Sequence, residues 1–591
     1  MEMEGREAAC PEEELVNSFR RHTLSSGLEP DVYLSWEGSL TELIEWTRTG
    51  IGQEKLADGR TVPLFLALLR KVHEGCLKVP QLGFIRILQL LLKLLRNLCV
   101  SDLNKNAFLA EHGVSLLVQI SAALLPASSL SHNSNQPTET ASFPKVPNES
   151  MIGSVSSLSE IRISLEAVGR NSCTSEATST GGKYSGEISA SAATESLRML
   201  LQLLGNFSRG GDECQMQIWR EFFPAMFTEL ALLRLNSVSD VICMILCTCC
   251  RGSTERSWQL CQGQGVGLMS LFISSAVTNE ETRDEKQIYW FESLWRHLCL
   301  EENFFPLLFT NLGIIPMRQE LELSKYQTEE YFCACQIWLR TCEFTFVQVR
   351  LLHLLLEALH DYLDGEEAGL KPFMPKDTLS FTVKILERAA DCAREELATP
   401  DSSAPPPSPT IKVLGYSLEF WRLLCTCDTN TEQQKVLTQV FIQHGLLDLL
   451  LKMLEALGPP EPPGRVRETF SGPPAGVPST DPYQGYKRDI VAVVANIAHE
   501  NKLVQNYVRE KGKLLVVLQQ CTVDRHNPFL REWGLWAMRN LLEGNDLNGK
   551  EVASLEMKET VNLPELTNMG LRFEVDPSTG GPRLVNIGSR E

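Results

Sequence analysis

The feature that most constrains this chain is an apolar helical segment that ends in asparagine and then recurs. Ala495–Asn501 (ANIAHEN) is answered 44 residues later by Arg539–Asn545 (RNLLEGN). A period in this range is typical of arrays of stacked helical units and not of a single catalytic pocket. The first expectation is therefore a binding scaffold built from helical repeats.

A shared spacing extends the array toward the other end of the chain. Asn97 and Asn496 are each followed 16 residues later by a glycine, Gly113 and Gly512. Looser copies contain Arg422–Cys425 with Gly445, and Asn206 with Phe222–Pro224 where the glycine would lie. We expect the glycines to end helices in the left-handed conformation, which glycine adopts without steric cost.

The apolar stripes of these segments predict how the units are held together. Ile490, Val493, Val494 and Ile497 recur at helical spacing, so they form one apolar face. A single helix cannot bury such a face alone, and neighbouring units must stack. The predicted fold is all-α, an armadillo/HEAT-like helical-repeat solenoid with disordered insertions and a short C-terminal extended tail.

Composition divides the chain into segments. Ser/Thr/Asn-rich stretches bury too little apolar surface to become ordered. Pro-rich stretches cannot continue a helix. At the end, alternating segments 571–576 and 583–587 flank a turn and predict a hairpin or extended tail. The predicted segments are N-terminal helical repeats (1–125), a disordered insertion (126–191), central repeats (192–398), a Pro-rich loop (399–410), a helical repeat (411–457), a Pro/Gly-rich linker (458–482) and C-terminal armadillo repeats with a tail (483–591).

Charge and cysteine content limit the function. A formal net charge of −19 argues against a general nucleic-acid or acidic-membrane binder, which needs basic surface. The N-terminus is acidic and lacks the apolar stretch of a signal peptide. Eighteen cysteines without a secretory signal predict reduced, packed thiols in the cytosol or nucleus. We therefore expect a soluble intracellular protein.

Near the C-terminus the match to a known family becomes specific. Asn527–Trp533 (NPFLREW) leads into Trp536–Leu541 (WAMRNL), after Gly485–Arg488 (GYKR) and the Asn496 helix. This block, residues 483–575, closely resembles the C-terminal domain of the ataxin-10 family, and the units around Asn97 and Asn206 resemble its earlier repeats more weakly. The resemblance implies armadillo-type repeats, a cytoplasmic protein without known enzymatic chemistry, and a role in cell division and cell survival exerted by binding other proteins.

The asparagines at helix ends, Asn97, Asn206, Asn496 and Asn540, are the first candidate binding residues. Asparagine is about 0.5 kcal/mol worse than alanine inside a helix, so its return suggests a hydrogen-bonding task. In peptide-binding armadillo proteins an asparagine four residues after a tryptophan holds an extended ligand, and Trp536 and Asn540 have that spacing. Lys93, Gln202 and Ala492 stand at the tryptophan position elsewhere. The alternative is that these amides cap helix ends or tie adjacent repeats together.

Other motifs favour structure over chemistry. Asn527-Pro528 predicts an inter-helix turn with proline at the first helical position and Glu532 in the first turn. Trp533 and Trp536 are expected to anchor repeat packing, with partner binding as the alternative. Cys247 and Cys250 lie in an apolar helix without a second ligand pair, which indicates buried thiols.

No catalytic, cofactor-binding or metal-binding residue is predicted. Gln262–Gly267 (QGQGVG) is glycine-rich but lacks the lysine and the preceding strand of a phosphate loop.

The functional expectation is a non-enzymatic protein-binding scaffold of the ataxin-10 type, acting in cytokinesis and survival signalling. Its expected partners are other proteins, with no nucleic acid, membrane or cofactor, and self-association is left open. The expected location is the cytoplasm, with the nucleus or perinuclear region as alternatives. Two other functions remain open: an armadillo peptide carrier of the import-receptor or catenin type, and a regulator of a partner enzyme.

Overall fold

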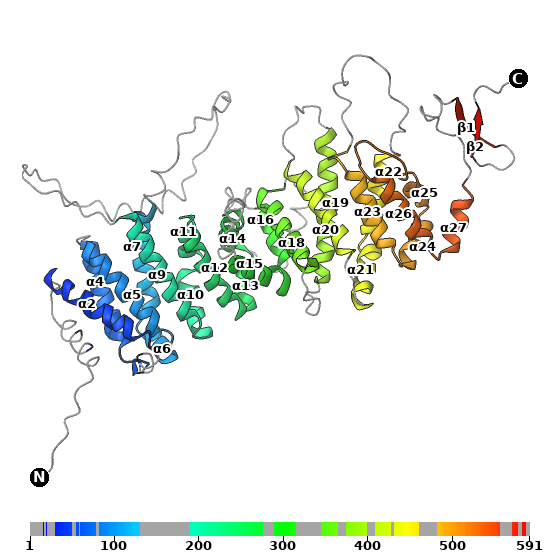
Figure 1. Ribbon diagram of the computed structural model, residues 1–591. Helices are drawn as coiled ribbons and strands as arrows, with labels where there is room; N and C mark the ends of the chain where they lie inside the picture. Colours follow the sequence, from blue (N-terminus) through cyan, green and yellow to red (C-terminus); the bar gives the residue numbers. More distant parts are fainter. Residues whose placement is uncertain are drawn as a thin grey trace, which may run out of the picture. The chain divides into compact units, whose positions relative to one another are not determined.

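The structure is a computed structural model. It describes residues 16, 19, 30–49, 52, 55–57, 59–78, 82–129, 189–275, 289–314, 344–364, 374–398, 408–426, 431–459, 481–555, 570–576 and 582–586. Contacts divide the chain into two compact units, Met1–Glu221 and Phe222–Glu591, which are described separately below. In both units the described elements are helices, apart from one hairpin in the second (Figure 1). The predicted all-α helical-repeat fold is confirmed.

The first unit is a stack in which α5 packs between α2 and α9, while α4, α6 and α7 pack against one another beside them (Figure 1). Its core is built from leucines of α5 and from the ring pair Phe108–Phe207, whose centroids are 5.1 Å apart. The helices are α2 (Pro30–Trp46), α4 (Val62–Lys78), α5 (Leu82–Leu98), α6 (Asp102–Ala110), α7 (Gly113–Ser129), α9 (Ala190–Ser208) and α10 (Asp212–Phe222), the last residue of α10 belonging to the second unit.

The second unit contains the longer series of helices. Its first part has α11 (Ala225–Ala231), α12 (Asn236–Arg251), α13 (Thr254–Leu260), α14 (Gly263–Ser275), α15 (Tyr289–Arg296), the π-helical turn η2 (His297–Glu301), α16 (Phe305–Ile314), α18 (Phe346–Asp364) and α19 (Lys376–Ala398). Its second part has α20 (Pro409–Leu424), α21 (Thr431–Gln443), α22 (Leu446–Leu457), α23 (Tyr486–Ala498), α24 (Lys502–Glu510), α25 (Leu514–Leu518), α26 (Leu530–Leu542) and α27 (Asp546–Ala553).

Within the second unit, α20, α23 and α26 form a row in which each helix packs on the next (Figure 1). The predicted apolar stripe of α23 is fully buried, with Ile490, Val493, Val494 and Ile497 at 0–2% exposure. Trp421 of α20 is also fully buried. Stacking of neighbouring helices therefore provides the burial that a single unit lacks.

The predicted C-terminal hairpin is present. Strands β1 (Leu571–Val575) and β2 (Pro582–Asn586) pair antiparallel, with Leu571 opposite Asn586 and Phe573 opposite Leu584.

Two of the three predicted helix-ending glycines adopt the left-handed conformation. Gly445 has φ 80° and Gly512 has φ 65°. The expectation is wrong for Gly113, because His112 takes the left-handed position with φ 55°. Gly113 serves a different purpose, since a Cβ there would lie 2.5 Å from the ring of the buried Phe108. Close packing, and not backbone freedom, requires glycine at this position.

Helices extend slightly beyond the predicted segment boundaries. α7 runs through Pro126 to Ser129, four residues into the segment assigned to the insertion, and α9 begins at Ala190. α20 begins at Pro409, because proline suits the first turn and the Ser408 hydroxyl accepts from the Ile411 N–H at 3.3 Å. The interiors of the predicted insertion (130–188), loop (399–407) and linker (460–480) lie outside the described residues.

Over the described part of the chain, no single helix has the length and apolar composition of a membrane span. α6 and α7 meet that criterion only when counted together across a bend of 71°.

Candidate protein-binding surface

The asparagines of the second unit bind the preceding repeat. The Asn540 side-chain amide of α26 donates to the Ala495 carbonyl of α23 at 2.9 Å. The Asn496 amide of α23 donates to the Arg422 carbonyl of α20 at 3.2 Å. The acceptor in the first pair is the residue immediately before the equivalent asparagine, so the contact repeats in register.

The first unit repeats this arrangement. The Asn206 amide of α9 donates to the Arg96 carbonyl of α5 at 2.9 Å, and Arg96 is again the residue before an asparagine. The Asn97 amide in turn donates to the Thr47 hydroxyl, at the end of α2, at 3.1 Å.

The reason lies in how each preceding helix ends. A helical carbonyl normally accepts from the N–H four residues later, but the last carbonyls of a helix lose this partner. At the end of α23, the His499 N–H donates to the Asn496 carbonyl three residues earlier and not to the Ala495 carbonyl four residues earlier. The Ala495 carbonyl accepts from the Asn540 amide instead. The Arg96 carbonyl lacks its backbone partner for the same reason, because the Val100 N–H donates to the Asn97 carbonyl. Likewise, the Thr426 N–H donates to the Leu423 carbonyl and not to that of Arg422.

These bonds confirm the interpretation that the asparagine amides tie adjacent repeats together. They bring Asn206 beside Asn97 in the first unit, and Asn540 beside Asn496 in the second. A protein-binding role for Asn97, Asn206, Asn496 and Asn540 stays a prediction.

A second set of buried amides completes the helix ends and was not predicted from sequence. Gln505 donates to the carbonyls of Ala498 at 3.3 Å and Asn540 at 2.8 Å. Asn548 donates to those of Leu541 at 2.8 Å and Gln505 at 3.1 Å. Gln505 lies nine residues after Asn496 and Asn548 lies eight residues after Asn540, and these similar distances are the sequence signal that could have pointed to them.

The turn before α26 is organised around a fully buried asparagine. The Asn527 amide donates to the Asp481 carboxylate at 2.8 Å and to Asp524 at 3.1 Å, and its oxygen accepts from the Lys487 backbone N–H at 2.9 Å. The Gly485 N–H donates to the His526 carbonyl at 2.8 Å. This turn therefore fixes the start of α26 against the start of α23.

The expected role of Pro528 as the first helical residue is wrong. α26 begins at Leu530, and Phe529 precedes it in the left-handed conformation with φ 65°. Glu532 does lie in the first turn, where hydrogen bonding to its own backbone N–H and then to Arg531 lowers the pKa of its carboxyl.

Phe529 is the most unusual residue of this turn. The corresponding position of the previous repeat, 44 residues earlier, is Gly485, with φ 95°. The left-handed conformation costs an L-residue with a bulky side chain about 1–2 kcal/mol. Phe529 keeps this conformation although the residue is 69% exposed and so contributes little burial. Strain in an exposed aromatic residue points to a role other than stability.

Phe529 borders a pocket of about 540 Å³ between α20 and the starts of α23 and α26. The aromatic residues that line it are Tyr416, Tyr483, Phe529 and Trp533, and Gly415 contributes a wall without a side chain. Aromatic surfaces with a few polar groups are enriched where proteins bind partners.

The charged residues of the pocket are largely paired. Arg488 binds Asp489 at 2.7 Å, and the Tyr483 hydroxyl donates to the same carboxylate at 3.1 Å. Burial, together with the Asp489 charge, raises the pKa of Tyr483 well above its usual value, so this hydroxyl stays a donor. Lys412 is exposed, and the described residues include no ion-pair partner for it.

The expected packing role of Trp536 is wrong. Trp536 is 52% exposed, and the Arg539 guanidinium lies 5.0 Å from its ring centroid. Trp533, one turn earlier on α26, is half-buried and lines the pocket. Trp536 lies beside this pocket on the helix surface, because residues three apart are neighbours on a helix.

The cysteines of α12 are packed as predicted. Cys243, Cys247, Cys249 and Cys250 are at most 1% exposed, and burial raises the pKa of Cys243, Cys247 and Cys250. Within the described ranges, no three His, Cys, Asp or Glu residues are grouped so that they could hold a metal ion.

Comparison with known proteins identifies the C-terminal block. Residues 486–585 match the family model described as the spinocerebellar ataxia type 10 protein domain. The ataxin-10 homolog of Dictyostelium discoideum is 32% identical over 108 residues, which cover 18% of each chain. Ataxin-10 of Xenopus tropicalis is 34% identical over 90 residues, 15% of this chain and 19% of the relative. Human ataxin-10 is 30% identical over 107 residues, 18% and 22% of the two chains.

The aligned part thus spans about a fifth of the length of these relatives. Among solved structures, an engineered protein aligns over 90% of this chain and 98% of its own, with 12% identity and a TM-score of 0.27; the fold therefore rests on the helices described above. The matched residues contain the Asn527 turn, Phe529, Trp533 and the Asn540 tie. The resemblance expected from the NPFLREW segment is confirmed, and residues 486–585 of this chain are an ataxin-10 domain.

Proposed function

We propose that this chain is a non-enzymatic, protein-binding scaffold of the ataxin-10 type, which binds protein partners through the aromatic surface around Phe529 and acts in cytokinesis and cell-survival signalling. The ataxin-10 domain and the helical repeats support this class of function.

One observation carries the proposal. Phe529 occupies a left-handed backbone position, exposes 69% of its surface and borders a pocket whose other walls include Trp533 and Tyr416. A residue selected for stability here would be glycine or asparagine, which adopt this conformation more readily. An aromatic anchor beside a pocket is the arrangement that supplies binding energy at protein interfaces.

The hydrogen bonds of the asparagines favour this scaffold over an armadillo peptide carrier. Such a carrier uses asparagine amides to hold the backbone of its ligand. Here, the Asn540 and Asn496 amides already donate to carbonyls of the neighbouring repeat. The aromatic pocket is therefore the better candidate for partner contact.

The test is Phe529→Asn in the full chain. Asparagine tolerates the left-handed conformation and caps helix starts, so this variant should fold with unchanged or slightly higher stability while losing the ring. Leu547→Ala on α27 is the matched control, since Leu547 is 55% exposed and does not line the pocket.

The measurement has two parts. Affinity purification from dividing cells should show partners that the wild type and Leu547→Ala retain and that Phe529→Asn loses. In cells depleted of the protein, the wild type and the control should restore normal division, whereas Phe529→Asn should leave multinucleate cells. An unchanged partner set for a folded Phe529→Asn would refute the proposed surface, and full rescue of division by that variant would refute its role in cytokinesis.

A further inference from the structure

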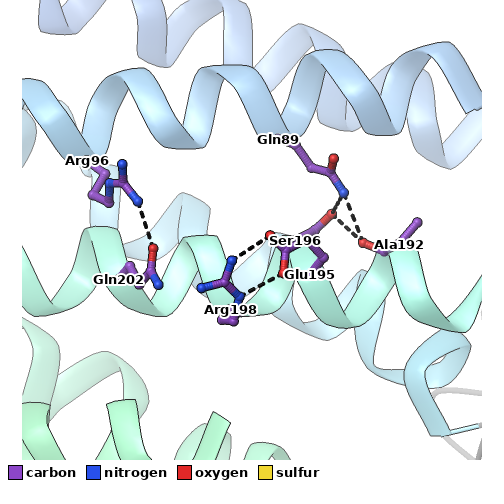
Figure 2. A network of polar contacts seen from close by, with 7 residues as sticks. All are labelled: Gln89, Arg96, Ala192, Glu195, Ser196, Arg198 and Gln202. Carbon is purple, nitrogen blue, oxygen red and sulfur yellow. Dashed lines mark hydrogen bonds and ion pairs between the residues drawn. The ribbon is translucent and has the colours of Figure 1, made fainter. Parts of the chain in front are cut away.

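Polar and charged side chains line the contact between α5 and α9 in the first unit, and Figure 2 shows Arg96, Glu195, Arg198 and Gln202 among them. We call the side chains of Lys93, Arg96, Glu195, Arg198 and Gln202 the α5–α9 strip. On α9, residues 195, 198 and 202 recur at helical spacing and share one face. Seam bonds such as that from Gln89 to the Ser196 hydroxyl, at 3.2 Å, hold the two helices in register.

Arg96 stands out within this strip because no carboxylate among the described residues pairs with it. Its Nη1 donates to the Gln202 Oε1 at 2.8 Å, while its Nε and Nη2 donate to the Asn97 Oδ1 at 3.3 and 3.1 Å. Figure 2 shows the guanidinium directed across the seam toward Gln202. Neutral amides thus orient the group, leave its charge uncompensated and leave two of its five N–H donors available.

The surroundings of Arg96 add further positive charge. Partial burial, then the nearby charges of Arg48 and Arg198, lower the pKa of Arg96. Arg198 binds Glu195 at 2.6 Å, and Arg48 binds Glu45 at 2.6 Å.

A hydrogen bond from Arg198, and then the charges of Arg198 and Lys93, lower the pKa of the Glu195 carboxyl, so this one carboxylate interacts with two cations. Among the described residues named here, four cations therefore share the two carboxylates Glu195 and Glu45, in a chain whose net charge is −19. An oriented, under-compensated arginine among other cations is a ready site for an anionic group.

The geometry points to an extended acidic peptide as the ligand. Packed helices lie about 8–10 Å apart, which equals about three residues of an extended polyproline II chain, in which residues three apart point to the same side. A peptide that crosses α2, α5 and α9 would thus present an anionic side chain to Arg96 and another, three residues away, to Arg48 or Arg198. Nucleic acid fits less well, because it needs many phosphate contacts and the rest of this acidic protein repels it.

We propose that the α5–α9 strip, with the adjacent Arg48, binds an extended peptide segment of a protein partner whose carboxylate or phosphate group sits on Arg96. This proposal does not rest on the aromatic pocket of the second unit. Phe529→Asn should therefore leave the binding of the acidic peptide unchanged, which separates the two proposals experimentally.

The test uses fluorescence anisotropy of the full-length protein with short labelled peptides at low and physiological salt. One peptide carries glutamates three residues apart, one carries phosphoserines at the same positions, and one carries glutamines. The anionic peptides should bind and the glutamine peptide should not, with weaker binding at higher salt. Whichever anionic peptide binds more tightly identifies the source of the anionic group.

The decisive variant is Arg96→Gln, and its matched control is Arg86→Gln. Both remove one positive charge from α5, but Arg86 already binds Glu37 at 3.0 Å and is compensated. Arg96→Gln should weaken the anionic peptide by about tenfold or more, and Arg86→Gln by less than about twofold. Circular dichroism of both variants checks that they fold.

Several results would overturn the proposal. These are failure of both anionic peptides to bind the wild type, equal binding of the glutamine peptide, or equal losses in Arg96→Gln and Arg86→Gln. Tighter, Arg96-dependent binding of a single-stranded RNA oligonucleotide would assign the strip to nucleic acid instead.

Discussion

Removal of the amide of Asn540 should loosen the contact between the last two large helices of the ataxin-10 domain. Asn540 is 6% exposed. Its side-chain amide donates to the Ala495 carbonyl, which has no backbone donor in the last turn of α23. Asn540→Ala leaves this buried carbonyl unpaired, which costs about 1–3 kcal/mol. Alanine regains about 0.5 kcal/mol through its higher helix propensity. The net loss should thus be about 0.5–2.5 kcal/mol.

Hydrogen exchange of the full chain measures this loss locally. Protection of amides in the last turns of α23 and in α26 should fall by about 2- to 60-fold, as this free energy dictates. Asn540→Asp should lose more, because it keeps the size of the side chain but places a carboxylate oxygen against the Ala495 carbonyl oxygen. Leu535→Ala is the control on the same helix, since Leu535 is 55% exposed.

The control should change protection by less than about twofold. If Asn540→Ala matched Leu535→Ala, and Asn540→Asp were no worse than alanine, the argument that this amide completes the end of α23 would fail.

Two further predictions concern packing and thiol chemistry. Gly113→Ala should lower the thermal midpoint, at a cost of about 1–3 kcal/mol, because its Cβ would lie 2.5 Å from the Phe108 ring. Gly83→Ala, where a Cβ meets nothing within 4 Å, should hold or raise that midpoint, and equal shifts would contradict the packing argument. Burial raises the pKa of the Cys521 thiol to about 11, so its alkylation in the native protein should be slow at neutral pH and accelerate about tenfold per pH unit toward that value. The fully buried Cys250 should react only after denaturation, and rapid labelling of either thiol at neutral pH would refute the burial argument.

Periodicity predicted the fold because it reflects local geometry. The stripe of α23 and the alternation of residues 571–576 each state which side of one element is apolar, and the structure buries or pairs them accordingly. Left-handed positions were less predictable. Gly445 and Gly512 adopt this conformation, but at the third turn His112 adopts it in place of Gly113. This was not predictable, since the sequence does not reveal that the Phe108 ring packs against Gly113.

The candidate surface was also harder to predict, because its residues come from distant parts of the chain. Tyr416 and Phe529 lie far apart in the chain, and only the packing of α20, α23 and α26 brings them to one pocket. One sequence signal was available. Phe529 stands 44 residues after Gly485, so alignment of the two repeats shows an aromatic residue where the backbone favours glycine.

The recurring asparagines show most clearly what each level decides. The sequence by itself determined that asparagine stands near the end of four apolar helices and that its return, at a cost in helix propensity, implies a hydrogen bond. Only the tertiary structure decided the acceptor, which for Asn206, Asn496 and Asn540 is the unpaired carbonyl one residue before the equivalent position in the neighbouring repeat. The physical reason is that a residue's propensity is a property of its own segment, whereas a hydrogen-bond partner depends on which helix end the fold places beside it.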